Sequence, residues 1–112
     1  MAVTLRSIGD GVVRTNSIDR VNYLNLMAKR LTGWTNEAAH AQPVEVVFRI
    51  VHHESRRPVR SPVAQCLSED RPVSLQPSTV LISRDGSEHS VKDSVSPVRD
   101  DSGKTVGVVL VF

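Results

Sequence analysis

Residues 97–112 read PVRDDSGKTVGVVLVF and contain the most apolar run of the chain. After the polar turn at residues 100–104, strand alternation gives the run one face made of Val106, Val108, Leu110 and Phe112. Val109 and Val111 then lie on the other face, where a half-buried strand would carry polar residues. We therefore predict a central strand of a sheet, with both of its faces covered.

Length and composition describe one ordinary globular domain. With 112 residues, the chain can bury roughly two thirds of its unfolded surface. A net charge of +2 is too small to indicate nucleic-acid binding. The single cysteine cannot form an internal disulfide, which either fits the reducing cytoplasm or carries no information about the compartment. No apolar run approaches the ~20 residues that span a bilayer, so we expect no direct membrane insertion.

The beginning of the chain predicts a lead-in followed by a hairpin. Runs 12–15 and 21–24 are β-rich and flank the polar residues 16–20, a pattern typical of a hairpin. Before residues 9–11, a short amphipathic segment can form from Val3, Leu5 and Ile8. The apolar run at the other end stops without a closing turn. We therefore expect residues 1–112 to be one module of a longer protein.

Three or four short helices are predicted next. Asn25 is placed to cap a helix over residues 26–32, and Gly33 to end it. Thr35 can cap a second helix. Pro62, after Ser61, is suited to the first position of a third helix, whose apolar stripe consists of Val63, Cys66 and Leu67.

Residues 49–60 show little periodicity and several arginines, which indicates an exposed basic connection. This segment could meet an anionic ligand or a partner's acidic face, or it could be only a solvated loop. Strand patterns return at residues 79–83 and 88–98, which form a hairpin. Strands and helices segregated in this way predict an α+β fold, in which one antiparallel sheet carries its helices on one face.

Several segments in this order resemble a bacterial PAS domain: residues 8–13, 21–25, Ala28 with 31–34, 47–51, 61–63, 81–86, 97–100 and 107–112. The resemblance covers nearly the whole chain and implies a five-stranded antiparallel sheet in the spatial order 2-1-5-4-3. That order places the last strand in the middle, in agreement with its two apolar faces. The resemblance also implies a sensory or interaction module of a histidine kinase or a cyclic-di-GMP enzyme, rather than a catalyst.

No residue pattern indicates an enzyme or a metal site. Cys66 lies on the apolar stripe of its helix, which favours a buried structural thiol over a reactive one. The histidines are not spaced as zinc ligands and are interpreted as solvated: His40, His52, His53 and His89.

The PAS resemblance also bears on cofactors. Light-sensing relatives carry a flavin-binding cysteine in the helix that matches residues 43–50, and haem-binding relatives carry a histidine in the helix that matches residues 62–70. Neither residue is present at these positions in this chain. We therefore expect neither flavin nor haem, while an unidentified small molecule stays open.

We predict a ligand pocket between the helices and the sheet, lined by Met27, Leu31, Trp34, Val47, Leu67, Val80, Ile82 and Val108. Trp34 could instead only anchor the junction of two helices. Ligand binding would shift the sheet and act on an effector beyond Phe112. The alternative is a ligand-free module that dimerises its parent protein. Val109 and Val111 would otherwise be an exposed apolar strip, so the lead-in segment, a second copy of the chain, or both must cover them. We predict a homodimer, whose face is Val3, Leu5, Ile8, Val109 and Val111.

Overall fold

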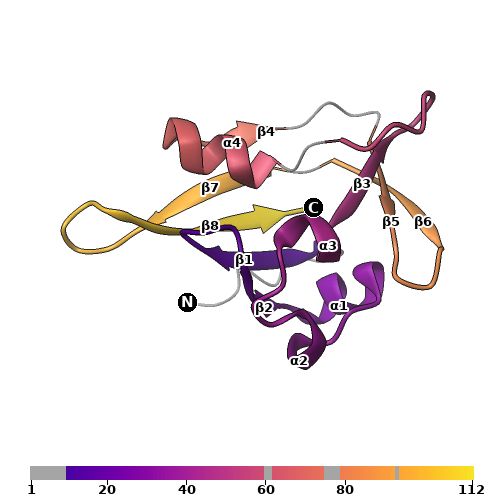
Figure 1. Ribbon diagram of the computed structural model, residues 1–112, viewed down its shortest axis with the longest axis horizontal. Helices are drawn as coiled ribbons and strands as arrows, with labels where there is room; N and C mark the ends of the chain where they lie inside the picture. The colour runs from indigo at the N-terminus through magenta and orange to yellow at the C-terminus, as the bar shows by residue number, and fades with distance from the viewer. Residues whose placement is uncertain (1–9, 60–61, 75–78, 93) are drawn as a thin grey trace.

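The computed structural model describes residues 10–59, 62–74, 79–92 and 94–112 (Figure 1). Its elements in chain order are β1 (Val12–Asn16), β2 (Val21–Leu24), α1 (Leu26–Thr32), α2 (Asn36–Ala39), α3 (Val44–Val47), β3 (Arg49–His52), α4 (Pro62–Glu69), β4 (Val73–Ser74), β5 (Thr79–Ile82), β6 (Glu88–Val91), β7 (Ser94–Arg99) and β8 (Thr105–Val111). Short helices and antiparallel strands make up an α+β fold, as predicted. The lead-in residues Val3, Leu5 and Ile8, and the cap residue Ser61, lie outside the described residues.

In the described part of the chain, the strands form two sheets. The larger sheet has the order β2-β1-β8-β7-β4, and the smaller one has the order β3-β5-β6. The final strand β8 therefore lies between β1 and β7, in the central position that its sequence predicts. Helix α4 packs against β7 and β8 on one face of the larger sheet (Figure 1).

The strand order differs in detail from the predicted 2-1-5-4-3. The predicted third strand corresponds to β5, which pairs with β3 and β6 in the smaller sheet. The predicted strand at residues 88–98 is divided into β6 and β7, because its first half pairs with β5 and its second half with β8. The two-residue strand β4 takes the edge of the larger sheet instead, where Val73 is paired with Val95.

Residues 49–52 correct the prediction of an exposed connection, because they form β3. Ile50 and Val51 are both buried, while Arg49 and His52 are exposed. Two consecutive buried residues are typical of a strand covered on both faces, but four residues are too few to show a period. The rest of the predicted connection is exposed from residue 53 to residue 58.

The helix ends follow the predicted capping residues. The Asn25 side chain accepts hydrogen bonds from the backbone N–H groups of Ala28 (2.8 Å) and Val12 (2.9 Å), so it caps α1 and fixes it to β1. Gly33 ends α1 with a φ of 77°, a conformation that glycine adopts without strain. Thr35 caps α2 through Ala38. None of the described helices has the length and hydrophobicity required to cross a membrane.

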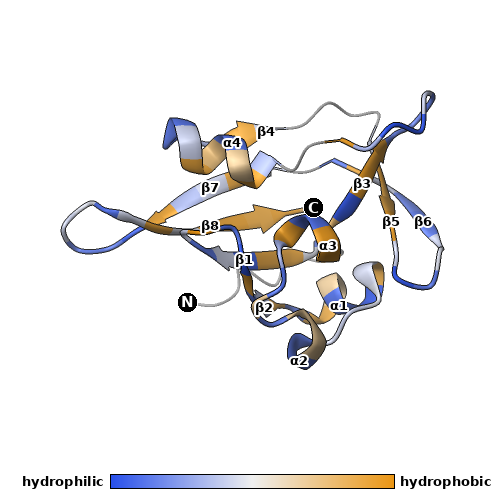
Figure 2. Cartoon of the chain, in the orientation of Figure 1, coloured by the Kyte–Doolittle hydropathy of each residue, from blue (hydrophilic) through white to orange (hydrophobic). Residues whose placement is uncertain are grey.

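The core is built on one face of β8. Val108 and Leu110 are fully buried there and Phe112 nearly so, as predicted. Val106 was predicted on the same face but is 42% exposed, because the hairpin of β7 and β8 extends past the helices (Figure 1). Figure 2 shows hydrophobic residues concentrated on β8, β1, β3 and β5, which are the strands nearest the interior.

Candidate functional site

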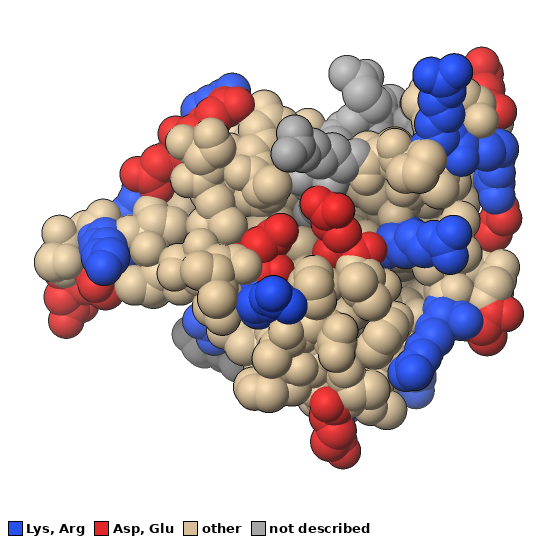
Figure 3. Space-filling view, in the orientation of Figure 1, with Lys and Arg blue, Asp and Glu red and all other residues tan. Residues whose placement is uncertain are grey.

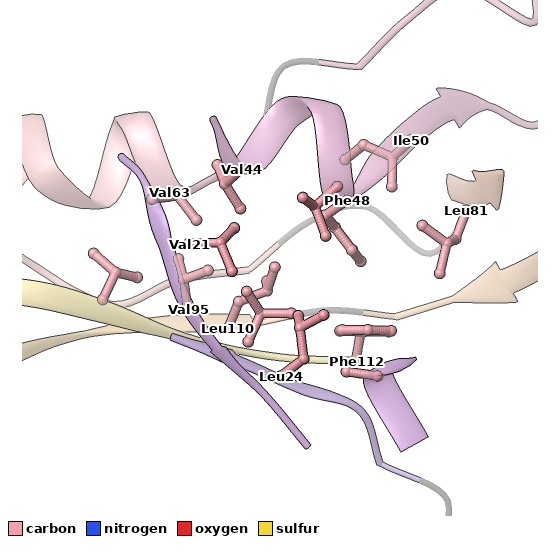
Figure 4. Close-up of a cluster of buried hydrophobic side chains, with 14 of the residues drawn as sticks. Val21, Leu24, Val44, Phe48, Ile50, Val63, Leu81, Val95, Leu110 and Phe112 are labelled. Atoms are coloured by element: carbon pink, nitrogen blue, oxygen red, sulfur yellow. The ribbon is translucent and has the colours of Figure 1, made fainter. Parts of the chain in front are cut away.

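The helices and the two sheets enclose a cluster of buried apolar side chains, which is the candidate ligand region (Figure 4). Leu24 comes from β2, Phe48 follows α3, and Leu110 comes from β8. In Figure 4 the labelled side chains of the two layers point toward one another. Any ligand held between helices and sheets would therefore contact or displace members of this cluster.

Phe112 connects this cluster to the end of the central strand. Its ring lies 4.7 Å from the ring of Phe48, centroid to centroid, with the planes inclined by 52°. Its backbone N–H donates to the Gly11 carbonyl (2.9 Å), and the Gly11 N–H donates to the Phe112 carbonyl (2.7 Å). The last residue after β8 is thus fixed to the residue before β1, with its side chain in the core.

Five of the predicted pocket residues meet at the cluster. Val47 and Val108 are buried members of it, and Leu31, Trp34 and Leu67 are partly buried and pack against it. Met27, on the same helix as Leu31, is half-buried.

The two predicted residues of β5 lie on the other face of that strand. Leu81 is fully buried in the cluster and is paired with Ile50 of β3. Since successive residues of a strand point to opposite faces, Val80 and Ile82 point away from the side that Leu81 occupies. Sequence reasoning missed Leu81 because three consecutive apolar residues do not show which of them faces the core. The pairing of β5 with β3 shows it.

Trp34 lies where α1 meets the turn after β5. The Arg84 guanidinium carbon is 4.2 Å from the centre of a Trp34 ring, a cation–π contact. The Arg84 N–H donates to the Thr32 carbonyl (2.8 Å). A Cβ on Gly33 would come within 2.8 Å of the Ser83 hydroxyl oxygen. Trp34 thus contacts the core on one side and is covered by Arg84 on another.

The structure places the thiol and the four histidines that were considered for reactivity or metal binding. Cys66 is fully buried, as predicted, and burial is the main cause that raises the pKa of its thiol, with a smaller contribution from Asp70. His40, His52 and His53 are exposed and His89 is half-buried. No cluster of three or more potential metal ligands occurs in the part of the chain that the structure describes.

The outer face of the larger sheet carries Val109 and Val111, two of the predicted dimer residues. Val109 and Val111 are half-buried. The register places Arg14 beside Val109, and Tyr23 beside Arg14. Because directly paired residues point to the same side, these side chains share the outer face, where Tyr23 is 43% exposed. The sequence did not reveal Tyr23, since only the hairpin register shows its face.

Acidic side chains from other parts of the fold lie near the predicted basic segment. Arg49, Arg56 and Arg57 are exposed, and Arg56 forms an ion pair with Glu88 of β6. At the right-hand end of Figure 3, basic side chains are interspersed with acidic ones. A solvated surface accounts for this pattern, and the prediction of an anionic partner stays untested.

Comparisons with known proteins agree on the fold. A family model described as the PAS fold matches residues 5–112. The probable diguanylate cyclase DgcE of Escherichia coli strain K12 is 28% identical over 110 residues, which are 98% of this chain and 10% of that protein. The chain therefore spans only a small part of that relative's length.

Two solved structures show the same fold at low sequence identity. The PAS domain of a protein from Colwellia psychrerythraea matches with a TM-score of 0.69 and 17% identity, over 99% of this chain and 94% of that one. A light-oxygen-voltage domain studied with a flavin analogue matches with a TM-score of 0.73 and 17% identity, over 97% of this chain and 79% of that one. At these identities the match concerns the fold alone.

Proposed function

Because the chain belongs to the PAS-fold family, we propose that it is the sensory module of a bacterial signal-transduction protein. It binds a small ligand between its helices and its sheets, and it relays ligand occupancy to an effector attached beyond Phe112. The module itself carries out no catalysis, and it works in the cytoplasm. The low-identity relative DgcE supports a cyclic-di-GMP enzyme as the effector, and a histidine kinase is the other candidate.

The position of Phe112 is the observation that carries this proposal. Phe48, which directly follows α3, contacts Phe112 at the end of the central strand. A ligand that changes the packing around Phe48 therefore acts on the point from which the chain leaves the domain. Such a ligand changes the equilibrium between two conformations of the domain, and it does so only by the difference between its binding free energies for the two.

Native mass spectrometry of the purified chain tests ligand binding. We expect a non-peptide mass that is retained under gentle conditions and released on unfolding. Leu31→Trp, which enlarges a half-buried side chain of the candidate pocket, is expected to lower its occupancy. Leu26→Trp is the matched control, because Leu26 lies on the same helix with 60% of its surface exposed. An empty wild-type protein would favour the alternative function below.

A ligand-free dimerisation module is the alternative, and the outer face of the larger sheet favours it. Val109 and Val111 form a half-buried apolar strip on the central strand of this face, and Arg14 separates Val109 from Tyr23 of the edge strand β2. Soluble proteins seldom leave such a strip in water, so a second copy of the chain is the proposed cover. Under this alternative the filled core has only a structural role, and the parent protein is brought together through the outer face.

A further inference from the structure

Asp19 has a buried carboxylate oxygen without a hydrogen-bond partner. Among the buried side-chain nitrogen and oxygen atoms of the described residues, Asp19 Oδ1 is the one that has no hydrogen-bond partner. Buried polar atoms are nearly always hydrogen-bonded, so an exception requires a physical explanation. Asp19 lies in the turn between β1 and β2 with a φ of 68°, a left-handed conformation that aspartate and asparagine tolerate best after glycine.

The backbone of Asp19 is bonded to the beginning of α3. Its carbonyl accepts a hydrogen bond from the Val44 N–H (3.0 Å), the first residue of that helix. Two further bonds join the same segments, from the Val21 N–H to the Gln42 carbonyl (2.9 Å) and from the Ala41 N–H to the Val21 carbonyl (2.8 Å). We call this set of three bonds the hairpin–α3 junction.

Two charged groups act on the Asp19 carboxyl, and they act in opposite directions. Glu45, in the first turn of α3, disfavours its negative charge, and Arg20, the next residue of the turn, favours it. The Arg20 guanidinium donates to the Ala41 carbonyl (3.3 Å). The Asn16 side-chain oxygen accepts from the Ile18 and Arg20 N–H groups. His40, in the segment before the junction, is exposed.

We propose that the Asp19 carboxyl is a proton-binding site at the hairpin–α3 junction, and that the junction is more stable when Asp19 is protonated. A proton neutralises the half-buried carboxyl and removes its repulsion with Glu45. Without the proton, a charged oxygen stays buried with no donor. Neither Asp19 nor Glu45 belongs to the buried apolar cluster or to the outer face, so this proposal does not depend on the proposed function.

The surroundings of the Asp19 carboxyl determine how its contribution to stability changes with pH. Burial is the largest cause that raises the pKa of Asp19 above its ordinary value of 3.8, and Glu45 adds to it, while Arg20 opposes it. The folded protein therefore binds this proton more tightly than the unfolded chain does. The resulting stabilisation is complete below pH 3.8 and is lost as the pH rises through the folded-state pKa.

A carboxyl-carbon NMR titration of the wild-type chain is the first test. Asp85 and Asp100 are internal references, because hydrogen bonds from Ser87 and Ser102 lower their pKa values. We expect Asp19 to titrate at a higher pH than both. An Asp19 midpoint at or below theirs would overturn the proposal. So would a midpoint that falls when magnesium or calcium chloride is added at constant ionic strength, because the oxygen would then bind a cation.

A first variant tests the effect of Glu45 on the Asp19 carboxyl. Glu45→Gln is expected to move the Asp19 midpoint to lower pH, and an unchanged midpoint would disprove this effect.

A second variant tests the effect of Asp19 ionisation on the junction. Asp19→Asn keeps a residue that tolerates the left-handed backbone and cannot ionise. In the wild type, protection of the Val44 amide against hydrogen exchange should decrease as Asp19 ionises, after correction for intrinsic rates. In Asp19→Asn it should stay constant. The Arg84 amide, bonded to Thr32 elsewhere, is the reference, and equal behaviour of the two amides would refute the junction effect.

Discussion

Gly107 lies against the backbone of Thr15 so closely that a Cβ at Gly107 would be 2.1 Å from the Thr15 carbonyl oxygen. Gly107 pairs with Asn16 at the place where β8 meets the end of β1. Because the obstructing atom belongs to the backbone of a neighbouring strand, it cannot rotate away. A side chain here must separate β1 from β8.

Gly107→Ala is therefore expected to lower the free energy of unfolding by about 3 kcal/mol or more, at the upper end for overpacked positions. Urea unfolding followed by far-UV circular dichroism measures this change. Val106→Ala is the control, because Val106 is adjacent and 42% exposed, and its cost should be much smaller. Similar costs for the two variants would show that the strands adjust to a side chain.

The cation–π contact between Arg84 and Trp34 gives a second prediction. Arg84→Ala should change the emission of the single tryptophan and cost about 0.5–1 kcal/mol, the range for a contact of this kind near the surface. Arg30→Ala is the control, because Arg30 is an exposed residue of α1. Unchanged Trp34 emission in Arg84→Ala would contradict the contact in solution.

The outer face of the larger sheet predicts a homodimer. Val111→Asp should give a monomer that still unfolds cooperatively, since a buried charge in a dimer contact is costly. Val106→Asp, at an exposed position of the same strand, should leave the dimer intact. Sedimentation equilibrium distinguishes the species. A wild-type chain that stays monomeric at high micromolar concentration removes the dimer prediction for this module.

The absence of a cysteine at residues 43–50 and of a histidine at residues 62–70 predicts a colourless protein. The purified chain should show neither a flavin absorption band nor a Soret band. The measurement is a visible spectrum of freshly purified protein, repeated after addition of flavin mononucleotide and of haem. A bound chromophore at equal molar ratio in either sample would disprove the prediction.

The two exposed turns make a pH prediction with the opposite sign to that of Asp19. The hydroxyl and N–H groups of Ser87 and Ser102 lower the pKa values of Asp85 and Asp100 below 3.8. Their stabilisation is therefore present above pH 3.8 and is lost as the pH falls through the folded-state values. Asp100→Asn should reduce the loss of stability between pH 4 and pH 2, as measured by thermal unfolding. An identical loss in the variant would contradict the role of this turn.

The central strand and the helix caps could be predicted because their signals are local. The two apolar faces of β8 predict a central position, and the side chains of Asn25 and Thr35 cap the helices that follow them. The contribution of Asn36 was missed. Its side chain accepts from the Leu24 N–H (2.8 Å) and donates to the Leu24 carbonyl (3.1 Å), which no helix propensity reveals.

The rest of the fold depends on partners that are distant in sequence. β5 pairs with β3 and not with the edge of the larger sheet, and this pairing joins residues as far apart as Ile50 and Leu81, which are thirty-one positions apart. That pairing also fixes which side of β5 faces the core, and therefore places Leu81 rather than Val80 at the candidate ligand region. Local alternation does not contain this information.

The position of β8 has a consequence for the order of events during synthesis. The strand that lies between β1 and β7 is the last of the described strands to leave the ribosome, although β1 is the first. At translation rates of about 5–20 residues per second, the inner edge of β1 stays unpaired for several seconds before β8 has been made. A nascent chain that has not reached β8 exposes the inner edges of β1 and β7 to other chains. Chaperone binding to stalled chains is accordingly expected to end when residue 112 emerges.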